Sequence, residues 1–206
     1  MNERLLRTAD ALRHHEFDVR CFETKEEALA AFLAETDPAD DVGFGGSVTL
    51  EEMGLYDALT ARGTCCYSHL FGHKPADVDR TVITDAAAAS PLYVASCNAV
   101  TETGELLNID GTGNRIASMA YGHKRCYLFV GKNKITGNLM EAYIRMQNVA
   151  CVSIAQKFGY DTPCAVTGKC QQCEAKKRIC RAILLLQWAP HSQPVTVYLI
   201  NEKLGY

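Results

Sequence analysis

The chain has 206 residues, of which 48% are hydrophobic and 22% charged, and its 21 basic and 24 acidic side chains give a net charge of −3. This length suits one α/β domain, and the composition excludes disordered, collagen-like and fibrous classes. The slight acidity argues against a nucleic-acid partner, because such binding needs a basic excess to neutralise phosphates. No apolar run approaches the ~20 residues that span a bilayer, so we expect no membrane partner.

Cysteine content indicates the compartment. The start of the chain, residues 1–7, has no apolar stretch that could serve as a signal peptide. Ten cysteines without an export signal point to a reducing environment in which disulfides are disfavoured, so we expect a cytoplasmic protein. Six of the ten are scattered and suit small buried positions, whereas the other four crowd into residues 164–180.

Helical and strand periods alternate along the chain. Helices are predicted over residues 3–17, 24–33, 49–61, 76–88, 112–121 and 139–150, and strands over 17–22, 41–44, 91–96 and 125–130. Capping boxes mark two of the helix starts, with Thr24 and Glu27 at one and Thr49 and Glu52 at the other. This alternation predicts an α/β fold with a mostly parallel sheet.

The pattern changes after the last predicted helix. Two strands, 183–188 and 195–200, flank the turn-rich segment 189–194, which predicts an antiparallel pair at the sheet edge. No repeat or low-complexity segment divides the chain. We therefore expect one domain over residues 1–206, with a Cys-rich insertion at 162–180.

The first candidate site is the glycine-rich segment 43–49, where a predicted strand ends and a predicted helix begins. Gly45 and Gly46 permit a tight turn, and Ser47 or Thr49 can cap the helix. Free N–H groups at the start of a helix attract phosphate or carboxylate. The alternative is an ordinary strand-to-helix turn, since the segment matches neither a Walker loop nor a dinucleotide fingerprint.

The second candidate is the polar run 98–115. It requires a tight turn at Thr103-Gly104, because the link from the preceding strand is too short for a helical crossover. The residues of this run that we assign to ligand binding are Asn98, Thr101, Asn108, Gly111, Thr112, Asn114 and Arg115. Solvated loop residues are the alternative. That alternative is weakest for Asn108 and Asp110, which flank Ile109 between a strand and a helix.

The third candidate is the loop after the strand 125–130, with Lys132, Asn133 and Lys134. Alone, these residues suit a solvated loop, although two cations at a strand end could neutralise an anionic ligand. In open α/β sheets the carboxyl ends of the strands gather at one edge, and ligands bind there. We expect the three segments to meet at that edge.

A cysteine cluster is the fourth candidate. Four thiols in the pattern Cys-x5-Cys-x2-Cys-x6-Cys could hold zinc or an iron–sulfur cluster, with Cys164, Cys170, Cys173 and Cys180 as ligands. The spacing matches neither a zinc ribbon nor a ferredoxin run, so buried free thiols and a redox-active Cys170–Cys173 pair remain alternatives. His69 and His73 also stand four apart, but a glycine and a proline near them favour a surface loop.

Four segments resemble the LUD (lactate-utilisation) domain family of bacteria. They are Gly-Phe-Gly-Gly-Ser-Val-Thr-Leu at 43–50, the run 98–115, Val-Gly-Lys-Asn-Lys-Ile at 130–135 and the Cys block at 162–180. The resemblance implies the fold of the sugar-phosphate isomerase and CoA-transferase superfamily, a Rossmann-like layered sheet. It also implies a role in L-lactate oxidation beside iron–sulfur partner subunits. Short members with the Cys block, which this chain resembles, stand apart from the lactate operon.

The wider superfamily suggests catalytic carboxylates. Asn98 holds the place of an Asp that ribose-1-phosphate isomerases use as acid/base, and an amide cannot transfer that proton. Glu102 falls near the position of the nucleophilic Glu of CoA-transferases. We take Glu102 and Asp110 as candidate catalytic residues, as general acid/base or nucleophile.

Two functional hypotheses lead at this point, and a scaffold with a vestigial pocket is a third that the many polar groups there disfavour. In one, the chain is a lactate-utilisation-type metabolic enzyme or subunit that binds a small anionic metabolite, a carboxylate or a sugar phosphate. In the other, it is a non-catalytic metal- or Fe–S-binding subunit or sensor, with an iron–sulfur redox protein as its partner. Either hypothesis is compatible with a homo-oligomer.

Overall fold

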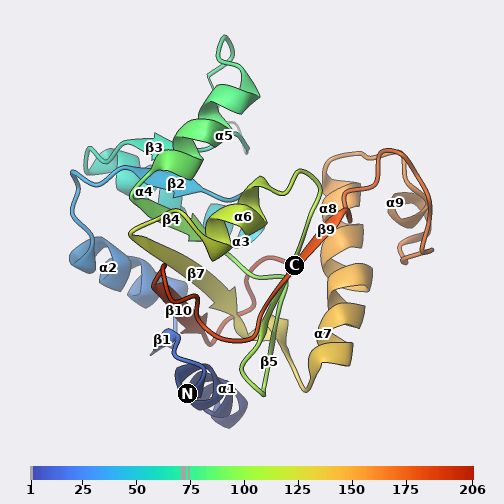
Figure 1. The fold of residues 1–206 in the computed structure, drawn as a ribbon, viewed down its shortest axis with the longest axis horizontal. Coiled ribbons are helices and arrows are strands. Elements are labelled where there is room, and N and C mark those ends of the chain that lie inside the picture. Colours follow the sequence, from blue (N-terminus) through green and yellow to red (C-terminus); the bar gives the residue numbers. More distant parts are fainter. Residues whose placement is uncertain (1, 71–72, 74) are drawn as a thin grey trace.

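The computed structural model describes residues 2–70, 73 and 75–206 (Figure 1). Its strands are β1 (Asp18–Phe22), β2 (Val42–Phe44), β3 (Cys66–Tyr67), β4 (Leu92–Ala95), β5 (Ala99–Thr101), β6 (Leu106–Asp110), β7 (Arg125–Gly131), β8 (Ile135–Thr136), β9 (Ala182–Leu186) and β10 (Val195–Ile200). Its α-helices are α1 (Glu3–His14), α2 (Lys25–Glu35), α3 (Val48–Glu52), α4 (Leu55–Ala61), α5 (Arg80–Ala89), α6 (Asn114–Ala120), α7 (Leu139–Arg145), α8 (Cys151–Lys157) and α9 (Pro163–Thr167). None of the described helices is both long and apolar enough to cross a membrane.

Two sheets organise these elements. The larger has the order β1-β10-β7-β4-β2-β3, and its neighbouring strands all run parallel. The smaller has the order β8-β5-β6-β9 and is mixed, since β5 runs parallel to β8 while β6 runs antiparallel to both β5 and β9. The predicted α/β class with a mostly parallel, layered sheet is confirmed.

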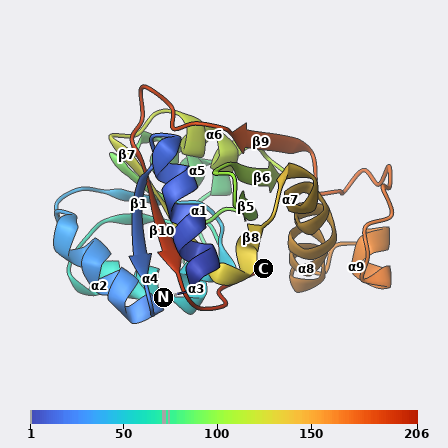
Figure 2. The same ribbon diagram turned by 90° about the horizontal axis from the view of Figure 1, so that it is seen from below.

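Strand β7 shows how the large sheet is covered on both faces. Cys126 and Leu128 belong to a core that includes residues of α1 and of the small sheet. Tyr127 and Phe129 point to the opposite face, where they contact Phe32 of α2 edge-on. The small sheet therefore lies on the α1 side of the large sheet, and α7 and α8 cover its outer face (Figure 2).

The predicted antiparallel pair at the C-terminus is wrong. Strand β9 lies at the edge of the small sheet beside β6, whereas β10 lies between β1 and β7 in the large sheet. All residues of β10 are buried, as is typical of a central parallel strand. The turn-rich segment between them crosses from one sheet to the other. Gln193 anchors this crossing, because its side chain donates to the carbonyls of Ser118 and Met119 and accepts from His123 N.

The predicted helix 49–61 is two helices. Gly54, with φ at 64°, separates α3 from α4. The cap of α3 is Ser47, whose Oγ accepts from Leu50 N at 3.4 Å, and not Thr49, which lies inside the helix with its side chain buried. The Thr24 cap of α2 is confirmed.

The predicted helix 139–150 is longer than expected. A π-helical segment, Met146–Ala150, joins α7 to α8, so the helical run continues to Lys157. A π turn holds one residue more than an α turn and changes which side chains face the core. In this chain the run therefore continues past the core of the small sheet and reaches the functional site.

Candidate functional site

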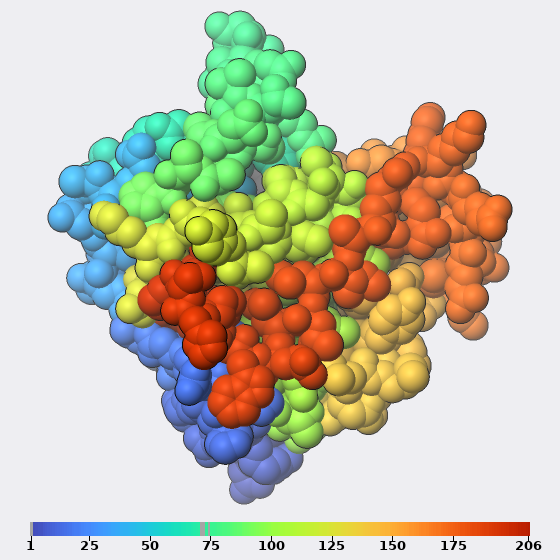
Figure 3. All heavy atoms as spheres, viewed as in Figure 1, coloured from blue at the N-terminus to red at the C-terminus, as the bar shows by residue number. Residues whose placement is uncertain are grey.

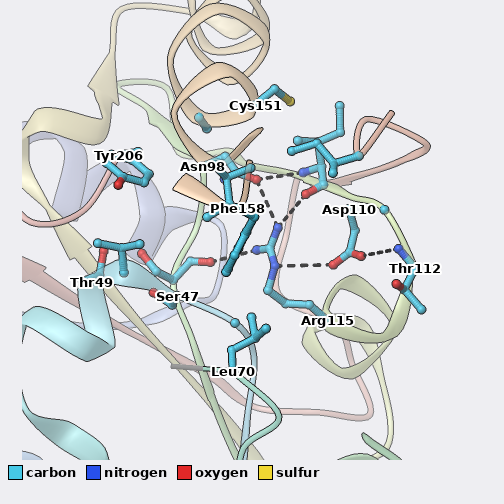
Figure 4. Close-up of a pocket in the computed structure, with 18 of the residues that line it drawn as sticks. Ser47, Thr49, Leu70, Asn98, Asp110, Thr112, Arg115, Cys151, Phe158 and Tyr206 are labelled. Carbon is cyan, nitrogen blue, oxygen red and sulfur yellow. Dashed lines mark hydrogen bonds and ion pairs between the residues drawn. The ribbon is translucent and has the colours of Figure 1, made fainter. Parts of the chain in front are cut away.

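A pocket of about 180 Å³ lies beyond the carboxyl ends of β2, β4 and β7 (Figure 4). The connection from β6 to α6 and one face of α8 close it. The predicted site residues that line it are Gly46, Ser47, Thr49, Asn98, Asp110, Gly111, Thr112, Asn114, Arg115 and Lys134. Each of the three predicted loop segments thus contributes to one cavity.

Arg115 lies at the centre of this site, and its guanidinium is held by the protein. Nη1 donates to Ser96 O at 3.2 Å and to Asn108 Oδ1 at 2.9 Å. Nη2 donates to Asn98 Oδ1 at 3.2 Å and to Ile109 O at 2.6 Å. Arg115 therefore ties the ends of β4 and β6 to α6 and holds the floor of the pocket in place.

Asp110 uses both carboxylate oxygens. Oδ1 accepts from Thr112 N at 2.8 Å and from Gly113 N at 2.9 Å, which fixes the turn into α6. Oδ2 lies 3.5 Å from Arg115 Nε, and both side chains are about nine-tenths buried. Asp110 is thus an ion-pair partner in the pocket wall, and Oδ2 is its less engaged oxygen.

Lys134 is the most deeply buried cation of the site, at 3% exposure. Its Nζ donates to Thr49 Oγ1 at 2.7 Å and to Ser96 Oγ at 2.8 Å. Burial lowers the pKa of Lys134 to about 8, and the nearby cations Arg145 and Arg115 act in the same direction. Within the part of the chain that the structure describes, no carboxylate forms an ion pair with Nζ.

One of the two histidines predicted to lie in a surface loop, His69, lies at the pocket. His69 lines the cavity beside Arg80, whose Nη2 is 3.4 Å from His69 Nε2. Burial lowers the pKa of His69, and the charge of Arg80 lowers it further. No sequence signal connects these two residues, since they come from the loop after β3 and from α5.

The pocket also has an apolar wall that the sequence analysis does not predict. Cys151, Ile154 and Phe158 line the pocket from the α8 end of the long helical run, and Tyr206 lines it from the C-terminal segment (Figure 4). The positions 151, 154 and 158 share one helical face, and this spacing could have revealed the wall had the helix been extended past residue 150.

Other predicted ligand-binding residues do not line this pocket; they are Gly45, Thr101, Asn108, Lys132 and Asn133. Gly45 lies behind Arg115, where an added Cβ would be 2.9 Å from Arg115 Cγ. Asn133 holds the C-terminal segment through Gly205 O and Leu204 N.

Glu102 is also remote from the pocket. Its carboxylate pairs with Arg4 Nε at 2.6 Å and Arg7 Nη2 at 3.3 Å, both on α1. The hydrogen bond from Arg4 lowers the pKa of Glu102 below its ordinary value. The structure therefore does not bring Glu102 into one cavity with Asp110.

The four clustered cysteines lie in the segment 162–180, which projects from one side of the molecule (Figure 3). Cys170 Sγ donates to Gln147 Oε1 at 3.4 Å, and Cys180 Sγ accepts from Arg178 Nε at 3.1 Å. The described residues contain no group of three or more His, Cys, Asp or Glu side chains placed to hold a metal ion, and all ten cysteines are free. The binding of zinc or an iron–sulfur cluster by these four cysteines therefore stays a prediction from their spacing.

Comparison with known proteins identifies the family. The model of the LUD domain matches residues 5–200. No curated protein matches the chain. A solved structure, a DUF162 family protein from Deinococcus radiodurans, is similar with a TM-score of 0.48 and 11% sequence identity, over 95% of this chain and 96% of that chain. From the extent of the domain match, the chain belongs to the LUD domain family.

Proposed function

We propose that this chain is a lactate-utilisation-type metabolic protein whose pocket binds a small organic anion, a carboxylate or a sugar phosphate. The observation that carries the proposal is Lys134, a buried ammonium whose described partners are two hydroxyl groups. A charge removed from water is costly unless an opposite charge pairs with it. An anion that enters the pocket would supply that opposite charge.

The charges around the cavity support the same conclusion. Among the described residues that line it, the cations are Lys134, Arg115 and Arg80, and the one carboxylate side chain is Asp110. The helix α3 has only five residues, so its N-terminus contributes little, and the attraction comes mainly from these side chains.

Size and polarity narrow the ligand class. The cavity of about 180 Å³ is smaller than the roughly 300–1,000 Å³ of sites for drug-sized molecules. Ile154 and Phe158 contribute apolar lining, and Lys134 contributes an ammonium. These features suit a short-chain acid with its charged end at Lys134.

Asp110 is the residue that we assign to proton transfer, in a catalytic role. It lines the cavity, and a ligand that displaces the 3.5 Å contact between Oδ2 and Arg115 Nε would be placed to exchange a proton with Oδ2. Glu102 has no part in this assignment, because α1 arginines hold it outside the pocket.

Binding is tested by thermal unfolding with L-lactate, pyruvate and ribose 5-phosphate as probes. A ligand at about 100 times its Kd should raise Tm by roughly 5–10 °C, because it adds about 2.7 kcal/mol of stability. The increase should vanish in Lys134→Met and persist in Lys132→Met, the matched control outside the cavity. If no probe raises Tm, or if Lys134→Met responds like the wild type, the anion-binding proposal fails.

A further inference from the structure

The hydroxyl groups around Lys134 are oriented by their own hydrogen bonds. Thr49 Oγ1 donates to Leu204 O at 3.2 Å, and Ser96 Oγ donates to Phe129 O at 2.5 Å. Because each hydroxyl hydrogen is used in this way, both oxygens act as acceptors toward Nζ. A neutral amine at this position would give both of its hydrogens to the two hydroxyls. Its lone pair would then be the part of the nitrogen without a described partner.

The surroundings of Nζ also favour the loss of its proton. Burial is the largest influence, and the guanidinium groups of Arg145 and Arg115 add to it, while Cys97 and Glu52 oppose it. Arg145 is fixed nearby, with Nε donating to Asn133 O at 3.0 Å and Nη1 to Asn98 O at 2.5 Å. With a pKa of about 8, the neutral fraction of Lys134 at pH 7 is about two orders of magnitude above that of an ordinary lysine.

We infer that Lys134 is a covalent nucleophile that forms a Schiff base with a small 2-oxo acid bound in the pocket. The inference rests on the proposed anion site and adds a reaction to it. Primary amines that are desolvated or placed beside other cations are the lysines that attack carbonyl carbons. In a 2-oxo acid the carbonyl carbon is one bond from the carboxylate carbon, so an ion pair to Nζ brings the carbon within reach of the nitrogen.

The step balances without a further reactant. The ammonium gives up a proton, the nitrogen lone pair forms a bond to the carbonyl carbon, and the carbonyl oxygen leaves as water. Overall, the ammonium and the oxo acid become an iminium and one water molecule, and the two hydrogens of that water come from the ammonium. The iminium nitrogen keeps the positive charge, so the carboxylate of the ligand is not left without a cation in the buried site.

Trapping with a reducing agent tests this directly on the full chain. The protein is incubated at pH 7 with pyruvate and cyanoborohydride, and the modified lysine is located by mass spectrometry of chymotryptic peptides. L-Lactate is the matched control, because it has the same carbon chain and charge but no carbonyl group. We expect one reduced adduct at Lys134, formed about 100-fold faster than at Lys132, and none with lactate.

Site mapping in the wild type makes the result independent of any variant, and Lys134→Gln provides a second check by losing the adduct. The inference is overturned if pyruvate raises Tm but no adduct forms, or if the label spreads over the exposed lysines; anion binding would then stand alone. If no anion raises Tm and no adduct forms, both the inference and the proposed function fail.

Discussion

Replacing Lys134 with methionine should stabilise the folded protein at pH 7 while it removes anion binding. Methionine has a similar length and carries no charge. The shift of the Lys134 pKa from 10.5 to about 8 corresponds to about 3 kcal/mol of unfavourable free energy for the buried ammonium. Removing the ammonium removes this cost, but the loss of its two hydrogen bonds offsets about 1–2 kcal/mol of the gain in stability. We expect a net gain of about 1–2 kcal/mol in the free energy of unfolding.

The dependence on pH gives the sharper test. The folded pKa of Lys134 lies below the unfolded value, so between pH 8 and 10.5 the unfolded chain binds the extra proton and wild-type stability rises with pH. Below pH 8 the cost of the buried charge is present in full. The methionine variant lacks this group. Its gain in the free energy of unfolding over the wild type should therefore shrink by about 3 kcal/mol between pH 8 and pH 10.5 and reverse in sign.

Urea unfolding followed by circular dichroism, at several pH values, measures both free energies. Both proteins retain the same cysteines and tyrosines, so the titration of these groups cancels in the difference between the two free energies of unfolding. Lys132→Met is the control, because Lys132 Nζ donates to Asn201 Oδ1 at 3.4 Å and its side chain is half-buried. A wild-type-minus-variant difference that stays constant from pH 7 to pH 10.5 would refute the assignment of Lys134 as a costly buried cation.

Three further variants test other parts of the structure. Asp110→Asn removes the negative charge from the pocket, so calorimetry should show anion binding tighter by about 1 kcal/mol, while turnover is lost; weaker binding would contradict this. Gly104→Ala should cost about 1–3 kcal/mol in urea unfolding, because φ is 97° and the new Cβ would lie 2.7 Å from Ala11 O; an unchanged midpoint would contradict the turn geometry. Cys170→Ser with Cys173→Ser should leave the ligand-induced Tm shift intact, since neither residue lines the pocket, and a lost shift would show otherwise.

Local patterns predict six of the ten described strands and miss β3, β5, β6 and β8, and strand partners are harder still to predict. The apolar run predicts the strand at 195–200, which the structure confirms, yet its neighbours β1 and β7 are distant in sequence. The turn-rich segment before it suggested a hairpin because hairpins and crossings use the same residue types. The nearly continuous apolar run of β10 does indicate its complete burial, because such a run is typical of a central parallel strand and not of an edge strand.

Topology predicts which of the candidate residues lie together. Parallel strand ends gather at one edge, and Ser47 after β2 and Lys134 after β7 accordingly line one cavity, which Asp110 reaches from the end of β6 in the mixed sheet. Local patterns do not predict contacts between residues that are distant in the chain. The α1 arginines that engage Glu102 lie about a hundred positions away in the chain, and no local pattern reveals them. The contribution of Ser96 to the pocket is predictable from topology, since Ser96 directly follows β4 at the same edge.

The π-helical segment between α7 and α8 makes the apolar lining of the pocket sensitive to the insertion or deletion of a single residue. Such a segment corresponds to one residue inserted into an α-helix, and each residue of an α-helix turns the chain by about 100°. Deleting one residue from 146–150 would restore the α register and swing Ile154 and Phe158 away from the cavity. The turn that carries Lys134, between β7 and β8, and the strand β6 that carries Asp110 lie outside this helical run. An in-frame insertion or deletion could therefore exchange one apolar wall of this pocket for another.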